Sequence, residues 1–167
     1  MNDKILVIGA TGNVDHTLVE LLAQKGERIK AATRHPESYS GPDGVQAIHF
    51  DYDQLDTYAP ALEEVDRMFV IAKPGDAEPE TTLIPFLNQS KAASLKHVVL
   101  MTARGVEQSE EVGLRQAERH LMASGIGYTI LRPTGFMQNF SHGFILPMIQ
   151  QSDAVYLPAG DGKTSFI

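Results

Sequence analysis

The stretch "KILVIGATGNVD" (residues 4–15) decides the fold of this chain. Its apolar run predicts a strand over Ile5–Ile8, and the spacing of Val14, Leu18, Leu21 and Leu22 predicts a helix that stops near Gly26. Gly9 and Gly12 lie between the two. A phosphate can approach the backbone N–H groups of such a turn closely, because no Cβ obstructs it. The alternative is a plain strand-to-helix turn that uses glycine.

The same alternation of strand and helix continues along the chain. Further strands are predicted at Ile29–Thr33, Val45–Phe50, Arg67–Ile71, His97–Met101 and Tyr128–Leu131. Most are continuously apolar, which is typical of parallel strands covered on both faces. Helical spacing between them involves Leu55, Tyr58, Ala59 and Leu62, then Leu83, Phe86, Leu87 and Ala93, then Leu114, Ala117 and Leu121. The pattern predicts an α/β fold with a doubly wound parallel sheet of the Rossmann type.

The composition limits the classes of function. The net charge of −7 disfavours nucleic acid and anionic membranes as partners. The chain has no cysteine, so disulfides and thiol chemistry are excluded, and the six histidines lack metal-ligand spacing. No apolar run approaches the ~18 residues of a membrane span, and no signal peptide opens the chain. We therefore expect a cytoplasmic protein with no metal site, no membrane partner and no nucleic-acid partner.

The last residues, "QQSDAVYLPAGDGKTSFI" (150–167), end in a strand-like apolar run rather than a polar tail. This favours one domain over residues 1–167 that is incomplete at its C-terminus.

Several motifs together resemble the NmrA-like family of the atypical short-chain dehydrogenase/reductase superfamily. They are "VIGATGNV" (7–14), "ATRHPE" (32–37), "HFDYDQLDTYAPAL" (49–62), "HVVLMTARG" (97–105) and "ASGIGYTILRPTGFMQNF" (123–140). In that family the loop reads G-x-x-G-x-x-G, and Gly9 and Gly12 match its first two glycines. The family continues past the point where this chain stops, into a small substrate-binding lobe.

The resemblance and the residues predict a cofactor site that prefers NADP (NADPH) over NAD. The second strand ends at Thr33 without the acid that usually binds the ribose of NAD, and Arg34 follows it. A guanidinium suits the 2′-phosphate of NADP, although Arg34 could also be a solvated surface residue. Asp51 resembles the family acid that binds adenine, and Lys73 borders the predicted crevice; a turn and an exposed loop are the respective alternatives. The predicted cofactor-binding residues are Gly9, Thr11, Gly12, Asn13, Val14, Arg34, Asp51, Ala72, Lys73, Thr102 and Pro133.

Asp15 stands where the family has its third glycine. A carboxylate in the first turn stabilises an empty helix N-terminus by ~0.3–1 kcal/mol, but it would repel bound pyrophosphate. If the side chain points to solvent, this penalty largely vanishes. We expect cofactor binding to be retained but weakened; the alternative is a closed site.

Catalytic residues are not evident in the sequence. No tyrosine has a lysine four residues later, so the Tyr-x-x-x-Lys pair of orthodox short-chain dehydrogenases is absent. Thr102 could orient a substrate carbonyl or merely cap its strand. Arg115, on the helix that carries a general-acid lysine in some relatives, is a poor proton donor. "RPTGFMQNF" (132–140) resembles the family loop beside the nicotinamide.

The leading hypothesis is an NADPH-dependent reductase of a small electrophile such as a quinone. The alternatives are a non-catalytic NAD(P) redox sensor and a scaffold whose site Asp15 has closed. The sequence leaves the oligomeric state and the substrate open.

Overall fold

The computed structural model describes residues 4–156, 162–163 and 165–167. These residues fall into two compact units, which divide after Leu131. The first unit contains β1 (Lys4–Ile8), α1 (Asn13–Gln24), β2 (Arg28–Thr33), β3 (Gln46–His49), α2 (Tyr58–Leu62), β4 (Val65–Ile71), α3 (Glu80–Ala92), β5 (His97–Met101), α4 (Gly113–Ala123) and β6 (Gly127–Leu131). Single turns of 3-10 helix lie at Pro36–Ser38, Leu55–Thr57 and Val106–Gln108.

The six strands form one parallel sheet in the order β3-β2-β1-β4-β5-β6. This is the doubly wound Rossmann fold that the sequence predicts, and all six predicted strands are confirmed, with ends that differ by two residues at most. The strand order reverses between β1 and β4. A crevice for a ligand forms at such a switch point, outside the carboxyl ends of the strands.

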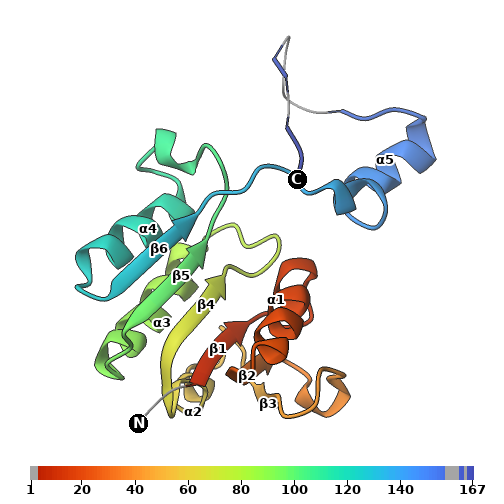
Figure 1. The fold of residues 1–167 in the computed structure, drawn as a ribbon. Coiled ribbons are helices and arrows are strands. Elements are labelled where there is room, and N and C mark those ends of the chain that lie inside the picture. Colours follow the sequence, from red (N-terminus) through yellow and green to blue (C-terminus); the bar gives the residue numbers. More distant parts are fainter. Residues whose placement is uncertain (1–3, 157–161, 164) are drawn as a thin grey trace. The chain divides into compact units, whose positions relative to one another are not determined.

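Helices cover both faces of the sheet (Figure 1). On one face α1 packs on β1 and β2, where Val19, Ile29 and Ala31 are buried. On the other face α2, α3 and α4 enclose the main core with Leu6 and Val98. Four aromatic rings, those of Phe50, Tyr52, Tyr58 and Phe86, pack together at one end of this core, with centroids between 4.8 and 6.0 Å apart.

Two of the predicted apolar stripes are wrong in detail. In α1 the buried residues are Asp15 and Val19, whereas Leu21 is 51% exposed, because the glycine turn sets which face of the helix meets the sheet. The helix predicted from Leu55 to Leu62 is divided, and Leu55 is 65% exposed. The Thr57 hydroxyl donates to backbone carbonyls and closes a separate turn there.

The second unit contains a 3-10 turn at Met137–Phe140 and α5 (Ile145–Ser152). Its C-terminal end joins the segment after Arg132: the Ile167 N–H donates to the Gly135 carbonyl, and the Phe140 and Phe166 rings lie 4.9 Å apart. Part of the strand-like run predicted at the C-terminus, residues 157–161 and 164, lies outside the described residues.

We predict that Phe86→Ala lowers the free energy of unfolding by about 3–5 kcal/mol, because it leaves a cavity among three aromatic rings. Urea unfolding of the chain measures this. The control is Leu55→Ala on the exposed side chain, for which we expect a change below ~0.5 kcal/mol. Equal effects of the two substitutions would contradict the packing described above.

Candidate functional site

The turn between β1 and α1 lies at the switch point of the sheet. Gly9 has φ = 76°, a left-handed conformation that glycine adopts without strain, and its N–H donates to the Ala32 carbonyl of β2. Gly12 is the N-cap of α1, and its N–H donates to the Gly9 carbonyl at 2.7 Å. The turn therefore aims the N-terminus of α1 along the crevice, in the arrangement that binds phosphate in nucleotide-binding folds.

A side chain at Gly12 would crowd the glycine turn. A Cβ placed there would lie 3.2 Å from the Gly9 carbonyl oxygen and 2.5 Å from Oδ2 of Asp15. The space that glycine leaves open in this turn is therefore taken by a carboxyl group. The turn has the backbone shape that a pyrophosphate needs, and the Asp15 carboxyl lies within it.

Asp15 points inward rather than to solvent. It is 4% exposed, and its Oδ1 atom has no hydrogen-bond partner. Burial raises the pKa of this carboxyl from 3.8 to about 7, while a hydrogen bond from its own backbone N–H acts in the opposite direction. A shift of this size is worth about 4 kcal/mol, and the helix dipole offsets only ~0.3–1 kcal/mol of it. Desolvation therefore dominates, and the sequence alone could not decide this orientation.

The predicted residues of the turn lie together, and others lie at neighbouring strand ends. Thr11, Gly12, Asn13 and Val14 form the turn and the first positions of α1. Arg34 follows β2 directly and is exposed, and the carbonyl of Arg34 lies 3.0 Å from Nδ1 of His49. No acid follows β2 before Glu37.

Asp51 and Lys73 both have partners within the protein. The Asp51 carboxylate accepts from the backbone N–H of Asp53 and from the Gln54 amide, so it stabilises the turn before α2. The Lys73 ammonium donates to Asp53 at 2.7 Å, and this hydrogen bond raises the pKa of Lys73. A phosphate would have to compete with Asp53 for this cation. Ala72 lies beside Lys73, half-buried at the end of β4.

Thr102 follows β5 and is buried, and its hydroxyl donates to Oε1 of Glu118 at 2.7 Å. Glu118 is fully buried on α4, and its Oε2 accepts from Arg115 at 3.0 Å. Hydrogen bonding to Glu118 and then to Glu110 raises the pKa of Arg115, so this guanidinium does not serve as an acid. A hydroxyl that already donates its proton to Glu118 can accept a hydrogen bond from a ligand but cannot donate one to a carbonyl.

Pro133 and the loop after it belong to the second unit, which is described by itself. Within that unit Gly135 bridges to Phe166, and the Thr134 hydroxyl is buried without a partner. The predicted role of this loop beside the nicotinamide stays a prediction.

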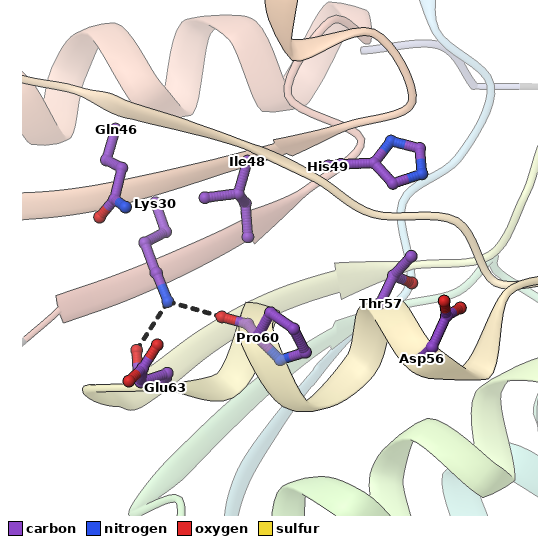
Figure 2. A pocket seen from close by; sticks show the side chains of 8 residues that line it. All are labelled: Lys30, Gln46, Ile48, His49, Asp56, Thr57, Pro60 and Glu63. Atoms are coloured by element: carbon purple, nitrogen blue, oxygen red, sulfur yellow. Dashed lines mark hydrogen bonds between the residues drawn. The ribbon is translucent and has the colours of Figure 1, made fainter.

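Sequence reasoning missed one buried cation, Lys30. A pocket of about 370 Å³ lies between β3 and α2, lined by Lys30, Gln46, Ile48, His49, Asp56, Thr57, Pro60 and Glu63 (Figure 2). The Lys30 ammonium points into the end of α2 and donates to the carbonyls of Pro60 at 2.8 Å and Glu63 at 2.7 Å. It thereby satisfies carbonyls that the end of a short helix leaves unpaired. A lysine inside a strand pattern, Ile29-Lys30-Ala31, was the signal that could have revealed it.

The described residues hold no group of three or more histidine, aspartate and glutamate side chains that could bind a metal ion. Within the same part of the chain, no helix is long and apolar enough to cross a membrane.

Fold and turn together define a dinucleotide-binding protein of the Rossmann class. The model of a family described as NAD(P)H-binding matches residues 9–155. The chain belongs to this NAD(P)H-binding family.

Similar proteins include oxidoreductases. An uncharacterized oxidoreductase of Bacillus subtilis (strain 168), YesF, is 30% identical over 99% of this chain and 56% of its own length. The prestalk A differentiation protein A of Dictyostelium discoideum is 34% identical over 98% of this chain and 55% of its own length. The crystal structure of an NADPH-dependent quinone oxidoreductase of Escherichia coli superposes with a TM-score of 0.66 at 26% identity, over 81% of this chain and 49% of that chain. The chain thus spans about half the length of these proteins.

We predict that Asp15→Asn stabilises the folded chain near pH 8 by a few kcal/mol, and that the gain shrinks as the pH falls toward about 4. The folded carboxyl keeps its proton up to about pH 7, whereas the unfolded one releases it near 3.8. The folded state therefore binds more protons in this window, and its stability falls as the pH rises through it. Asparagine cannot ionise, so the substitution removes this cost.

Thermal unfolding across this pH range measures the difference. The control is Glu20→Gln, on the exposed side of the same helix. A stabilisation by Asp15→Asn that does not change with pH would mean that the buried carboxyl is not the titrating group.

Proposed function

We propose that this chain binds NADP(H) at the glycine turn and is the cofactor-binding part of a reductase that passes hydride to a small electrophile such as a quinone. The observation that carries the proposal is the glycine turn at the switch point of the sheet, in a chain of the NAD(P)H-binding family. The YesF protein is called an oxidoreductase, and the superposed Escherichia coli protein is an NADPH-dependent quinone oxidoreductase.

The preference for NADP rests on Arg34. It stands at the end of β2, where an NAD site has an acid for the ribose hydroxyls. Its exposed guanidinium offers planar, charge-assisted hydrogen bonds to a 2′-phosphate. The turn would bind the pyrophosphate through backbone N–H groups of the first turn of α1, and Asp51 and Ala72 would border the adenosine.

The proposed hydride transfer needs no acidic side chain of the protein as a proton donor. The bound cofactor supplies a hydride, and a quinone that accepts it takes up one proton to become a hydroquinone. The sequence has no Tyr-x-x-x-Lys pair, and the Thr102 proton is already donated to Glu118. We therefore propose that the proton comes from water. We further propose that the residues that select the acceptor lie outside this chain, which spans about half the length of its relatives.

One observation favours a second function, a redox sensor that binds the dinucleotide without turnover. The hydroxyl predicted to orient a substrate, that of Thr102, donates to the buried Glu118, which also accepts from Arg115. NADPH consumption in the presence of a quinone separates the two functions. A reductase oxidises NADPH when the quinone is in excess. A sensor binds NADPH saturably and leaves the absorbance band of the reduced nicotinamide unchanged.

We predict that Arg34→Ala weakens NADPH binding about 10- to 100-fold and leaves NADH binding unchanged, because charge-assisted hydrogen bonds are worth about 1.5–3 kcal/mol. Calorimetric titration of both nucleotides measures the two dissociation constants. The matched control is Arg28→Ala, at the opposite end of the same strand. Equal losses for NADPH and NADH would contradict a role for Arg34 in recognising the 2′-phosphate.

A further inference from the structure

The carboxyl group of Asp15 lies inside the turn where the proposed pyrophosphate binds. Its Oδ2 atom is 2.5 Å from the position that a Cβ of Gly12 would take and 3.5 Å from that of Gly9. The side chain is more than nine-tenths buried, and Oδ1 has no partner. A buried carboxyl that reaches into the N-terminus of a 12-residue helix and keeps one oxygen without a partner is a feature that a ligand can satisfy.

The neighbours of this carboxyl come from the ends of β1 and β4. The Ile71 side chain, at the end of β4, lies 3.6 Å from the position that a Cβ of Gly9 would take. The Tyr52 hydroxyl donates to the Ile71 carbonyl at 2.8 Å. Burial raises the pKa of Tyr52 well above its usual value, and the negative charges of Asp15 and Asp76 add to this. An ionised Asp15 therefore disfavours the ionised form of Tyr52.

No described cation compensates Asp15. On α1 its neighbour His16 pairs with Glu20, 3.4 Å away and on the exposed side. From the β4–α3 segment the ionisable groups are the acids Asp76 and Glu78 and the cation Lys73, which pairs with Asp53 and Asp76. From the segment after β3 the facing group is the neutral Tyr52. The charge of an ionised Asp15 is thus opposed by burial and supported by none of these groups, and burial raises its pKa to about 7.

The two forms of this carboxyl treat a phosphate in opposite ways. An ionised carboxylate repels a phosphate oxygen in a desolvated cleft and offers it no donor. A neutral carboxylic acid has an O–H that can donate to that oxygen, and hydrogen bonds to a charged acceptor are short and strong. The same residue therefore excludes the ligand in one protonation state and binds it in the other.

We propose that Asp15 is a proton-dependent ligand of the dinucleotide: it donates an O–H hydrogen bond to the pyrophosphate as a neutral acid, so that cofactor binding takes up one proton. The inference rests on the proposed function, because it needs a dinucleotide in this crevice. It makes the redox cofactor's affinity a function of pH in the range near neutrality.

The direction of the effect follows from linkage. A bound phosphate raises the pKa of Asp15 further, so the complex holds a proton that the free protein loses above about pH 7. Affinity is then constant below about pH 7. It falls about tenfold for each pH unit above it, until the pKa of the complex is reached.

The test is calorimetric titration of NADPH into the whole chain from about pH 6.5 to 9, in two buffers of different ionisation enthalpy, which counts the protons taken up on binding. For the natural chain we expect a dissociation constant that rises about 10- to 100-fold between pH 7 and 9, with uptake approaching one proton near pH 8. Asp15→Asn keeps the shape and an N–H donor but cannot ionise. We expect a flat affinity and no uptake beyond the small contribution of the ligand's own 2′-phosphate, whose pKa is about 6.

The control is Glu20→Gln, which should keep the pH dependence of the natural chain. A pH dependence that persists in Asp15→Asn would overturn the inference, since another group would then carry the proton. A flat profile in the natural chain, with tighter binding in Asp15→Gly at every pH, would also overturn it and make Asp15 a steric obstacle only. If neither the natural chain nor Asp15→Gly binds NADPH at any pH, the proposed function itself fails, and the inference fails with it.

Discussion

The position of β1 is the constraint on which the rest of this structure depends. Its residues 5–8 are buried and pair with β2 on one side and with β4 on the other. The chain must therefore leave β1 at the point where the strand order reverses, and it does so through the left-handed turn at Gly9. This places the N-terminus of α1, with its unpaired N–H groups, over the crevice. The central position of β1 in the sheet thus determines both the strand order and the place of the binding site.

Three buried ionisable side chains of the first unit show how differently such groups are accommodated. The Lys30 ammonium donates to carbonyls at the end of α2. Glu118 accepts from Arg115 and from the Thr102 hydroxyl. Asp15, in contrast, keeps one oxygen without a partner. Buried polar groups in folded proteins are nearly always hydrogen-bonded, so this oxygen calls for an explanation, and the place of Asp15 in the glycine turn supplies one.

The hydrogen bonds that link Thr102, Glu118 and Arg115 limit the chemistry that this site can perform. The end of β5 borders the region where a hydride acceptor would lie in the proposed enzyme, and there the hydroxyl already donates its proton to a carboxylate. This arrangement suits an acceptor that needs no proton from the protein at the moment of hydride transfer. It suits a sensor equally well, which is why turnover rather than binding separates the two.

The sequence by itself determined the sheet. Continuous apolar runs such as Val98–Leu100 and the glycine pair after Ile8 are local signals, because both faces of a parallel strand are buried and a left-handed turn needs glycine. The site residues at strand ends follow from the same topology, and their roles as ligands of the cofactor remain predictions.

Only the tertiary structure decided which face of α1 is buried, and hence that Asp15 points inward while Leu21 lies in solvent. Helical spacing fixes the relative positions of side chains around a helix but not the rotation of that helix against the sheet. The sequence also could not reveal the partners of Lys73 and Thr102. Asp53 and Glu118 are 20 and 16 residues away along the chain. Such pairings form only when strands and helices distant in sequence come together.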